Sequence, residues 1–524
     1  MNQSAAPGAP TPGTLAETLR ANARYHGDSV AVLCNGRSLT HAELYRRARR
    51  LAAAWAAAGL KPMDRVSVLA MNEIEYFELY AAAELSGIVL ATLNFRLAVP
   101  ELAFILKDSA PRHLVFEAQY LSAVEQLRAQ VPGIEQYACI GGEAPWARDY
   151  EHYLQEEDTA IEPVPPQLGD LAYLVYTSGT TGRPKGCMLG QRAMTSFAET
   201  LSGIMQSSSS DRTLLMMPMF HVGAKMIQLG AHWQGGTVVL HRSFDAKAIL
   251  ETIERERITV THMAPTMIQM LLDHPDVRLH DLSSLRMLVY SAAAMPVALL
   301  RRGLALLGPI FTQMYGQTEG AGTVLPASHH KPDGSERDRE RFKSIGVPMR
   351  GTEVRIVDTQ GHDCAPGAPG EIVIRGPMCM QGYWNNSAAT LEALRDGWLH
   401  TGDVGRFDDD GFITLVDRMK DVIVSGGENI YSREVEEALY EHAAVREVAV
   451  IGEPDAKWGE AVCAVVALQP GATADDEQLT AFCRERIAGY KRPRRYVFVA
   501  TLPKLPSGKI DKREVRRLHG RAAL

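Results

Sequence analysis

The sequence lacks the features of a membrane-spanning or secreted protein. No apolar run approaches the roughly 18 residues that a membrane-spanning helix needs. Residues 1–13 contain neither a basic segment nor an apolar segment of the kind found in secretory signals, so we expect a disordered tail there and a cytoplasmic protein. Seven cysteines without a CxxC pair do not fit the usual zinc-site spacing and favour a reduced intracellular chain.

Over the chain as a whole, the 55 Lys and Arg residues are outnumbered by 62 Asp and Glu residues. A formal net charge of -7 argues against a general nucleic-acid binder. Between residues 486 and 524, however, twelve Lys and Arg residues stand against two acidic residues, a local excess of +10. A solvated basic tail and a nucleic-acid patch would both have this composition, but ligands that carry several phosphates explain it more economically.

The chain is long enough for more than one domain, at 524 residues. Near its start, helical spacing at residues 39–60, 73–86 and 120–130 alternates with short apolar strands at residues 65–70 and 112–116. This alternation predicts a mostly parallel sheet with helices on both faces. Ligands of such sheets bind at the carboxyl ends of the strands.

A stretch rich in glycine and hydroxyl groups follows the apolar strand at residues 171–176. Its glycines, Gly179 and Gly182, let the backbone approach an anion, and Lys185 adds a positive charge. The stretch does not fit the common nucleotide P-loop, because that loop needs Ser or Thr after its lysine and Gly186 stands there. Taken alone, it predicts either a phosphate-binding loop or a plain polar hairpin.

The segment from Tyr176 to Gly186 resembles the signature loop of the adenylate-forming superfamily, which includes acyl-CoA synthetases, firefly luciferase and the adenylation domains of peptide synthetases. Further motifs follow in the expected order. The resemblance implies an α/β fold, with a large N-terminal domain of mostly parallel sheets flanked by helices, a small antiparallel subdomain, and a small mobile α+β C-terminal domain. It implies that the loop binds ATP through Thr177, Ser178, Gly179, Thr180, Thr181, Gly182 and Lys185.

A second segment, YGQTEG at residues 315–320, resembles the next signature of the superfamily. The resemblance implies that Tyr315 offers a flat face to the adenine and that Thr318 contacts the α-phosphate. Glu319 would bind Mg²⁺, which takes few protein carboxylates and completes its shell with phosphate and water. Without the first loop, these residues would predict a turn followed by a helix. The further ATP-binding residues implied by resemblance are Gly316, Gln317, Asp403 and Arg418.

Turn-rich, alternating stretches at residues 370–376 and 381–384 predict the small antiparallel subdomain. The hydrophilic residues 329–343 predict a solvated surface loop. Asp403 follows a tight glycine turn, and by resemblance its carboxylate accepts hydrogen bonds from the ribose hydroxyls while Arg418 contacts the same sugar. In isolation, Asp403 would be interpreted as a surface turn residue.

The resemblance also assigns an acyl pocket to His221, Val222, Lys225, Ala292 and Ala293. His221 would line its carboxylate end. The helix after His221 would form a wall, and Lys225 and Gln228 interrupt its apolar face. Either both side chains point into solvent, or they place a polar group partway down the pocket. Ala292 stands where relatives often carry glycine, so its methyl group would shorten or tilt the pocket.

Residues 417–421 are the expected domain boundary, which separates an N-terminal ATP- and acyl-binding domain at residues 14–419 from a C-terminal domain at residues 420–524. By resemblance, Lys420 is the hinge, where a polar residue tolerates exposure and a large backbone rotation. Ser432 is expected to cap the helix that follows it.

The resemblance identifies Lys509 as the catalytic lysine. The preceding Ser-Gly pair would let it reach the cleft of the other domain, where its ammonium bridges the substrate carboxylate and the α-phosphate. A lysine this close to the C-terminus would otherwise be interpreted as solvent-exposed. Thr318 and Glu319 complete the implied catalytic set. The implied CoA-binding residues are Gly426, Gly427, Trp458, Tyr490, Arg492 and Arg494.

These residues together imply an ATP-dependent acyl-CoA ligase, which joins a carboxylic acid to AMP with release of pyrophosphate and then transfers the acyl group to coenzyme A. We expect a medium- or long-chain fatty acid, with an aryl acid of the benzoate or cinnamate type as the alternative. A freestanding adenylation enzyme that loads a carrier protein and a non-enzymatic nucleotide sensor remain open. The expected ligands are ATP, Mg²⁺, coenzyme A and a small carboxylic acid, without nucleic acid; homodimers are common among such relatives.

Overall fold

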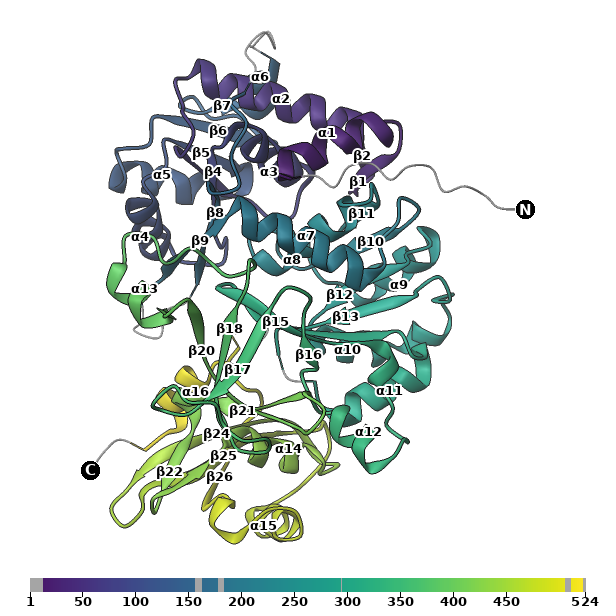
Figure 1. The fold of residues 1–524 in the computed structure, drawn as a ribbon, viewed down its shortest axis with the longest axis vertical. Coiled ribbons are helices and arrows are strands. Elements are labelled where there is room, and N and C mark those ends of the chain that lie inside the picture. Colours follow the sequence, from purple (N-terminus) through teal and green to yellow (C-terminus); the bar gives the residue numbers. More distant parts are fainter. Residues whose placement is uncertain (1–12, 156–162, 178–182, 294, 505–509, 522–524) are drawn as a thin grey trace.

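Two mostly parallel sheets form the body of the N-terminal domain (Figure 1). The structure, a computed structural model, describes residues 13–155, 163–177, 183–293, 295–504 and 510–521. The strands of the first sheet are β3 (Arg65–Leu69), β4 (Val89–Thr92), β5 (His113–Glu117), β6 (Gln136–Ile140), β7 (Arg148–Asp149), β8 (Leu171–Thr177) and β9 (Lys185–Gly190). Their order is β7-β6-β5-β3-β4-β8-β9, and among them β9 alone runs antiparallel to its neighbour.

The second sheet is larger. Its strands are β1 (Val30–Cys34), β2 (Arg37–Thr40), β10 (Arg212–Leu215), β11 (Thr237–Leu240), β12 (Val260–Met263), β13 (Met287–Tyr290), β14 (Phe311–Gln317), β15 (Gly320–Leu325) and β16 (Val347–Pro348). Their order is β16-β15-β14-β13-β12-β10-β11-β1-β2, with antiparallel pairing at both edges and parallel pairing between. The carboxyl ends of β12, β13 and β14 therefore lie side by side at one edge of this sheet.

Helices cover both sheets and fill the space between them. They are α1 (Leu15–Tyr25), α2 (His41–Ala57), α3 (Ile74–Ser86), α4 (Val99–Ser109), α5 (Leu121–Gln130), α6 (Tyr150–Gln155), α7 (Gln191–Met205), α8 (Val222–His232), α9 (Ala246–Arg255), α10 (Pro265–Leu272), α11 (Val297–Leu307), α12 (Glu336–Arg341) and α13 (Ser387–Ala393). Helix α3 contacts strands of both sheets, and every one of its residues is buried. Helix α7 contacts β8 and β9 of the first sheet and packs on α8, which contacts β10 and β11 of the second. Short 3-10 turns are η1 (Ala118–Tyr120), η2 (Pro275–Arg278), η3 (Ala327–His329), η4 (Met419–Asp421) and η5 (Gly489–Lys491).

The remaining elements form two smaller units below the main body in Figure 1. An antiparallel sheet consists of β17 (Glu353–Val357), β18 (Gly370–Arg375), β19 (Leu394–Arg395), β20 (Trp398–Phe407) and β21 (Ile413–Arg418). The C-terminal α+β unit consists of β22 (Ile423–Ser425), β23 (Glu428–Ile430), α14 (Ser432–Tyr440), β24 (Val445–Asp455), β25 (Gly459–Leu468), α15 (Asp476–Arg484), β26 (Arg495–Phe498) and α16 (Lys512–His519). The fold class expected from the sequence is confirmed. No helix among the described residues is long and apolar enough to cross a bilayer.

Most of residues 329–343 are exposed or half-buried, as expected, but the interpretation of the segment as a loop is wrong. The segment contains helix α12, which begins with a capping box because Ser335 Oγ accepts a hydrogen bond from the Asp338 amide. It also contains His330, whose side chain is buried and whose ring nitrogen Nε2 lies 2.9 Å from the Tyr290 hydroxyl. Polar composition concealed a histidine that packs into the domain.

The expected cap of α14 by Ser432 is also wrong, because Ser432 is the first helical residue. The cap comes from Asp417 in β21, on the other side of the expected boundary. The Asp417 carboxylate accepts hydrogen bonds from the Ser432 amide, from Ser432 Oγ at 2.8 Å, and from the Arg433 amide at 3.4 Å. A negative charge there also favours the helix dipole. Residues 1–12 of the expected N-terminal tail lie outside the described residues.

Candidate active site

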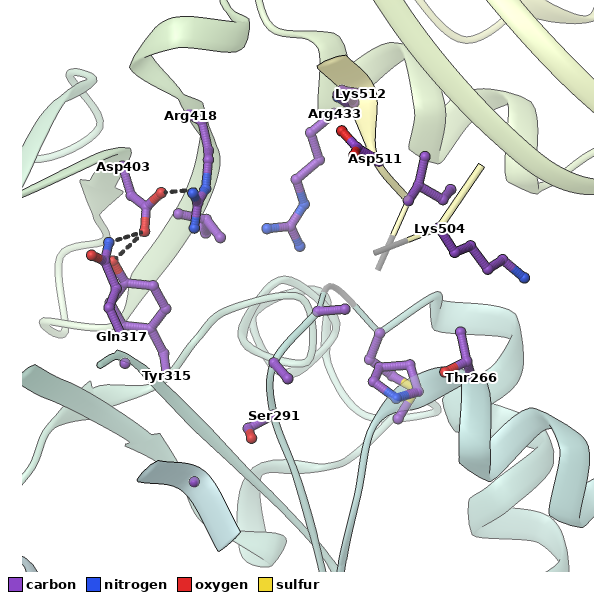
Figure 2. Close-up of a pocket in the computed structure, with 18 of the residues that line it drawn as sticks. Thr266, Ser291, Tyr315, Gln317, Asp403, Arg418, Arg433, Lys504, Asp511 and Lys512 are labelled. Atoms are coloured by element: carbon purple, nitrogen blue, oxygen red, sulfur yellow. Dashed lines mark hydrogen bonds and ion pairs between the residues drawn. The ribbon is translucent and has the colours of Figure 1, made fainter. Parts of the chain in front are cut away.

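A large cleft lies where the N-terminal domain meets the C-terminal unit. Its volume is about 1880 Å³, and it opens at the carboxyl ends of β12, β13 and β14. Figure 2 shows two groups of side chains facing each other across it. Tyr315, Gln317, Asp403 and Arg418 stand on one side, and Lys504, Asp511 and Lys512 stand on the other.

A hydrogen-bonded cluster is centred on Asp403, whose side chain is buried at the cleft (Figure 2). The Tyr315 hydroxyl donates to Asp403 Oδ2 at 2.7 Å, and Gln317 Nε2 donates to the same oxygen at 3.0 Å. Arg418 Nε lies 3.1 Å from Asp403 Oδ1. Burial and the Asp403 charge raise the pKa of Tyr315 well above its usual value, so its phenol stays protonated and remains a donor.

The backbone explains why Tyr315 and Gln317 face the same way as Asp403. Both lie at the end of β14, which continues through the signature and pairs with β15 as a hairpin. A side chain at Gly316 would meet the Ala321 backbone at 2.8 Å, so the turn of the hairpin accepts only glycine there. The turn-and-helix alternative that these residues would predict in isolation is excluded.

Glu319 lies at the cleft beside the first loop. Tyr383 donates a hydrogen bond to Glu319 Oε1 at 2.8 Å, and the Lys185 ammonium lies 5.0 Å from the centre of the same tyrosine ring. No cluster of three or more His, Cys, Asp or Glu side chains that could enclose a metal occurs among the described residues. A single accessible carboxylate nevertheless fits Mg²⁺, because this ion takes most of its ligands from phosphate and water.

Residues 380–384 connect the two signatures through their backbone. The Met380 amide donates to the Glu319 carbonyl at 2.8 Å, and the Trp384 amide donates to the Gly186 carbonyl at 2.7 Å. Between these contacts, Met188 of β9 exchanges backbone hydrogen bonds of 2.9 Å with Gln381 and Gly382. The strip 380–384 therefore fixes β9 and Glu319 relative to each other.

The first signature loop is described only at its ends. Thr177 closes β8 and Lys185 begins β9; the two residues are paired across the strands and both line the cleft. Gly186 packs so closely on the Tyr176 ring that a side chain there would approach it to 2.9 Å. The other loop residues predicted to bind ATP, Ser178, Gly179, Thr180, Thr181 and Gly182, lie outside the described residues.

Four of the five predicted acyl-pocket residues line the cleft: His221, Val222, Ala292 and Ala293. His221 precedes α8, and its ring packs against Phe220 with the centroids 4.4 Å apart. Ala292 has a φ of 73°, in the left-handed region that favours glycine. The backbone at this position is therefore strained with alanine and would be unstrained with glycine.

Lys225 does not line the cleft. Its side chain neither points into solvent nor places a polar group in the pocket, so both interpretations from the sequence were wrong. Its side chain is 2% exposed, and its ammonium lies 2.6 Å from Glu84 Oε1 in α3 and 2.6 Å from Gln228 Oε1. The Tyr80 ring lies beneath the ammonium, 4.3 Å away, and Tyr173 donates a hydrogen bond to Glu84. Burial lowers the pKa of Lys225, while Glu84 opposes that shift. The wall helix thus turns its polar side toward α3 rather than toward the pocket or solvent.

The structure brings three residues to the cleft that were not predicted from the sequence. Arg433, at the start of α14, extends into it in Figure 2, and its Nε lies 2.9 Å from Glu437. His262 and Ser291, at the ends of β12 and β13, form a hydrogen bond of 2.7 Å between His262 Nε2 and Ser291 Oγ. A lone histidine in an apolar strand predicts a structural residue, so only the neighbouring strand shows that the pair meets at the cleft.

The predicted catalytic lysine, Lys509, lies outside the described residues. The residues on either side of that gap, Lys504 and Ile510, form a backbone bridge with each other, and both line the cleft. The predicted hinge residue, Lys420, lines the cleft as well. Lys504 and Asp511, on either side of the undescribed residues, therefore face the Asp403 cluster from the opposite side of the cleft (Figure 2).

The predicted CoA-binding residues lie on the C-terminal unit and do not line the cleft, and two of them, Gly426 and Arg494, contact Trp458. The Gly426 amide donates to the Trp458 carbonyl at 2.7 Å, and the Arg494 guanidinium lies 4.7 Å from the centre of the Trp458 ring. Gly427 follows in the β22–β23 turn with a φ of 86°. Tyr490 is 46% exposed, and Arg492 Nε donates to the Gly489 carbonyl at 3.3 Å.

The chain is similar to known proteins over almost its whole length. Residues 19–384 match the AMP-binding enzyme family, and residues 434–509 match the AMP-binding enzyme C-terminal domain. The chain is 42% identical to a feruloyl-CoA synthase from Amycolatopsis sp, over 95% of this chain and 97% of that protein. It is 37% identical to the fatty acid–[acyl-carrier-protein] ligase ScoC of Streptomyces coeruleorubidus, over 96% of each. The crystal structure of the anthranilate CoA ligase AuaEII in complex with anthranoyl-AMP superposes with a TM-score of 0.88 at 27% identity, covering 97% of this chain and 98% of that one.

Proposed function

This chain belongs to the AMP-binding enzyme family, and from that premise we propose that it forms the CoA thioester of an aromatic carboxylic acid. It is an AMP-forming acid–thiol ligase that uses ATP and coenzyme A. The observation that carries the proposal is one shared cleft: the Asp403 cluster lines it from the N-terminal domain, and the ends of the Lys509 segment line it from the C-terminal unit.

The reaction has two steps. A carboxylate oxygen of the acid attacks the α-phosphorus of ATP, the bond between the α- and β-phosphates breaks, and pyrophosphate leaves with its electrons. The thiolate of coenzyme A then attacks the carbonyl carbon of the acyl adenylate, and AMP leaves; the thiol proton passes to solvent. Neither step needs a side-chain nucleophile. The chain has to bring anions together and offset their repulsion.

The Asp403 cluster is the proposed nucleoside site. Because Tyr315 and Gln317 both donate to Oδ2, the Asp403 carboxylate is held in one orientation, with Arg418 beside Oδ1. A carboxylate fixed in this way is a strong acceptor for the paired hydroxyls of a ribose. The Tyr315 ring would pack against the adenine, with Gly316 alongside it.

Cations surround the proposed phosphate site. Lys185 approaches from β9 and Arg433 from α14, and Lys509 would come from the C-terminal segment. Glu319 would hold Mg²⁺, with Thr318 next to the α-phosphate; when bound, the ion neutralises phosphate charge as pyrophosphate departs. The remaining loop residues, between Thr177 and Lys185, would supply hydroxyl and backbone donors.

We propose that the two steps use different arrangements of the C-terminal unit. The ends of the Lys509 segment line the cleft, whereas the Trp458–Arg494 pair with Gly426 does not. Rotation near Lys420 would exchange these two faces, so that Lys509 serves adenylate formation and the Trp458 face brings coenzyme A to the adenylate. The domain boundary at Lys420 belongs to this proposal.

An aromatic acid is favoured over the fatty acid that we expected from the sequence. The relative with 42% identity is named for feruloyl-CoA, and the superposed AuaEII structure holds anthranoyl-AMP. The cleft also has an apolar lining from α7, α8, β14 and the segment between β10 and α8, which suits the ring of an aromatic acid: Phe197, Leu201, Met217, Phe220, Met226 and Met314.

Loading of a carrier protein is the second candidate, because the relative with 37% identity is named as a ligase of an acyl carrier protein. The two candidates share the first step and differ in the thiol that accepts the acyl group. AMP release driven by coenzyme A alone supports the proposal. Release that requires a phosphopantetheinylated carrier protein would favour the alternative.

A hydroxamate-trapping assay tests the substrate class. The purified full chain is incubated with ATP, Mg²⁺ and hydroxylamine, and with cinnamic, benzoic, octanoic or decanoic acid in turn. We expect the highest kcat/KM with an aromatic acid, and thioester formation with the same acid when coenzyme A replaces hydroxylamine. A higher kcat/KM with octanoic or decanoic acid than with any aromatic acid would contradict the proposal.

A further inference from the structure

A polar pair, His262 and Ser291, lines the cleft next to the predicted acyl-pocket residues Ala292 and Ala293. His262 lies near the end of β12, and Ser291 directly follows the parallel neighbour β13, with His262 and Val289 paired in register. Both residues line the cleft. Gly223 of α8 lies beside the imidazole: a Cβ built at Gly223 would stand 3.8 Å from His262 Cε1, which is an ordinary packing distance. Figure 2 shows Ser291 across the cleft from Arg433.

The hydrogen bonds of this pair are incomplete within the protein. His262 is 2% exposed, its Nε2 contacts Ser291 Oγ at 2.7 Å, and its Nδ1 has no hydrogen-bond partner among the described residues. Burial lowers the pKa of His262 to about 4, so the ring is neutral at neutral pH. If Nε2 carries the proton, the Ser291 hydroxyl is free to donate; if Nδ1 carries it, Ser291 Oγ is free to accept.

We infer that Ser291 is the group that recognises a ring oxygen of the substrate, a hydroxyl or an ether on the aromatic acid, and that His262 is its positioning residue. The inference rests on the proposed function and deepens it from an aromatic acid to an oxygenated aromatic acid. An alkyl chain or a bare ring would leave the Ser291 hydroxyl without a partner on the substrate. A ring hydroxyl completes its hydrogen bonds whichever tautomer His262 adopts, and an ether oxygen does so when Nε2 carries the proton.

The test compares acids that differ by one oxygen: cinnamic acid and its 2-, 3- and 4-hydroxy isomers. Adenylate formation is measured as pyrophosphate release by the wild-type chain, Ser291→Ala, His262→Leu and His262→Gln. For the isomer that the wild type uses best, we expect Ser291→Ala to lower kcat/KM about tenfold, mainly through a higher KM, and to change kcat/KM for cinnamic acid less than twofold.

His262→Leu should have the same selective effect. His262→Gln should keep most of the wild-type kcat/KM that His262→Leu loses, because an amide group in that position still offers a hydrogen-bonding partner to Ser291. Ser210→Ala is the control: Ser210 is exposed and does not line the cleft, so loss of its hydroxyl should leave kcat/KM unchanged for both kinds of acid.

Two results would overturn the inference in distinguishable ways. Equal losses on cinnamic acid and on the best hydroxy isomer, or no loss on the hydroxy isomer, refute the role of Ser291 while leaving an aromatic substrate in place. A wild-type preference for octanoic or decanoic acid over all four aromatic acids refutes the proposed substrate class, and the inference with it.

Discussion

At the scale of single residues, the buried pair of Lys225 and Glu84 shows how strongly local chemistry depends on distant partners. Both side chains are almost fully buried, and they lie in different helices, α8 and α3. An ammonium in such a place is tolerated only with a counter-charge and further hydrogen bonds, which Gln228 and the Tyr80 ring help to supply. The pair therefore joins the pocket wall to the core helix α3.

Removing one member of the pair should be far more harmful than replacing both. We expect Glu84→Gln to lower the free energy of unfolding by about 3–5 kcal/mol, because it leaves the Lys225 charge buried without compensation. The double variant Lys225→Met with Glu84→Leu should recover much of that loss. Urea denaturation followed by circular dichroism measures both.

The exposed pair of Arg257 and Asp281, 2.8 Å apart, is the matched control. Arg257→Ala should cost less than about 1 kcal/mol, since solvent screens a surface pair. A cost for Glu84→Gln no larger than that of Arg257→Ala would show that the buried charge is not what holds α8 to α3.

Some residues at the cleft could be predicted from the sequence and others could not. Asp403 and Tyr315 could be predicted because each lies in a motif whose spacing is specific. Lys225 could not, because nothing near it in the sequence reveals Glu84. Ser291 and His262 were not predicted for the same reason: their contact depends on the register of β12 and β13, which composition does not determine.

At the scale of elements, the strands and helices of the large domain were largely predictable from alternating apolar patterns. The exceptions have physical causes. Helix α12 is short and polar, so its signal is a capping box rather than an apolar stripe. The start of α14 was misjudged because its cap, Asp417, comes from another element.

The cap of α14 gives a prediction for this helix alone. Replacing Asp417 with alanine removes the acceptor for the first amides of α14, which should destabilise the helix by about 1–2 kcal/mol. In hydrogen-exchange mass spectrometry, amides of residues 432–440 should then exchange about tenfold faster.

Asp245→Ala serves as the control, since Asp245 caps α9 by accepting from the Ala248 amide at 2.8 Å. It should accelerate exchange in α9 and leave α14 unchanged. Unaltered exchange of α14 in Asp417→Ala would mean that the contact across the boundary contributes nothing to the helix.

At the scale of the whole molecule, the separation of the two proposed ligand faces predicts a separation of half-reactions. Lys509→Ala should abolish adenylate formation, because it removes the ammonium that we propose to bridge the acid and the α-phosphate, yet spare thioester formation from a supplied acyl adenylate. Pyrophosphate release measures the first step and thioester formation, followed by chromatography, the second. Trp458→Ala should show the reverse pattern, and equal loss of both steps in Lys509→Ala would argue against two arrangements.

Acid sensitivity is a second property of the whole molecule. Burial lowers the pKa of His41, His113, His262 and His330 to about 4. Between pH 6.5 and 4 the unfolded chain binds these protons and the folded chain does not, so stability falls as pH falls, by about 1.4 kcal/mol per pH unit for each histidine. Below pH 4 this contribution levels off.

Urea denaturation at several pH values between 4 and 7 measures this slope. Replacing His113, which contacts the Tyr153 hydroxyl at 2.8 Å, with glutamine should make the slope shallower by about 1.4 kcal/mol per pH unit near pH 5. A slope that is unchanged in His113→Gln would show that this imidazole is protonated in the folded chain.

The strip at residues 380–384 sets a rule for how the chain can change in length. Its backbone is hydrogen-bonded to Glu319 at one end and to Gly186 at the other. An insertion or deletion within it would therefore shift the segment around Glu319 relative to β9. Turns such as residues 358–362, which bond only to their own neighbourhood, are free of that constraint. Insertions and deletions among homologues of this protein should therefore occur in such turns and not within residues 380–384.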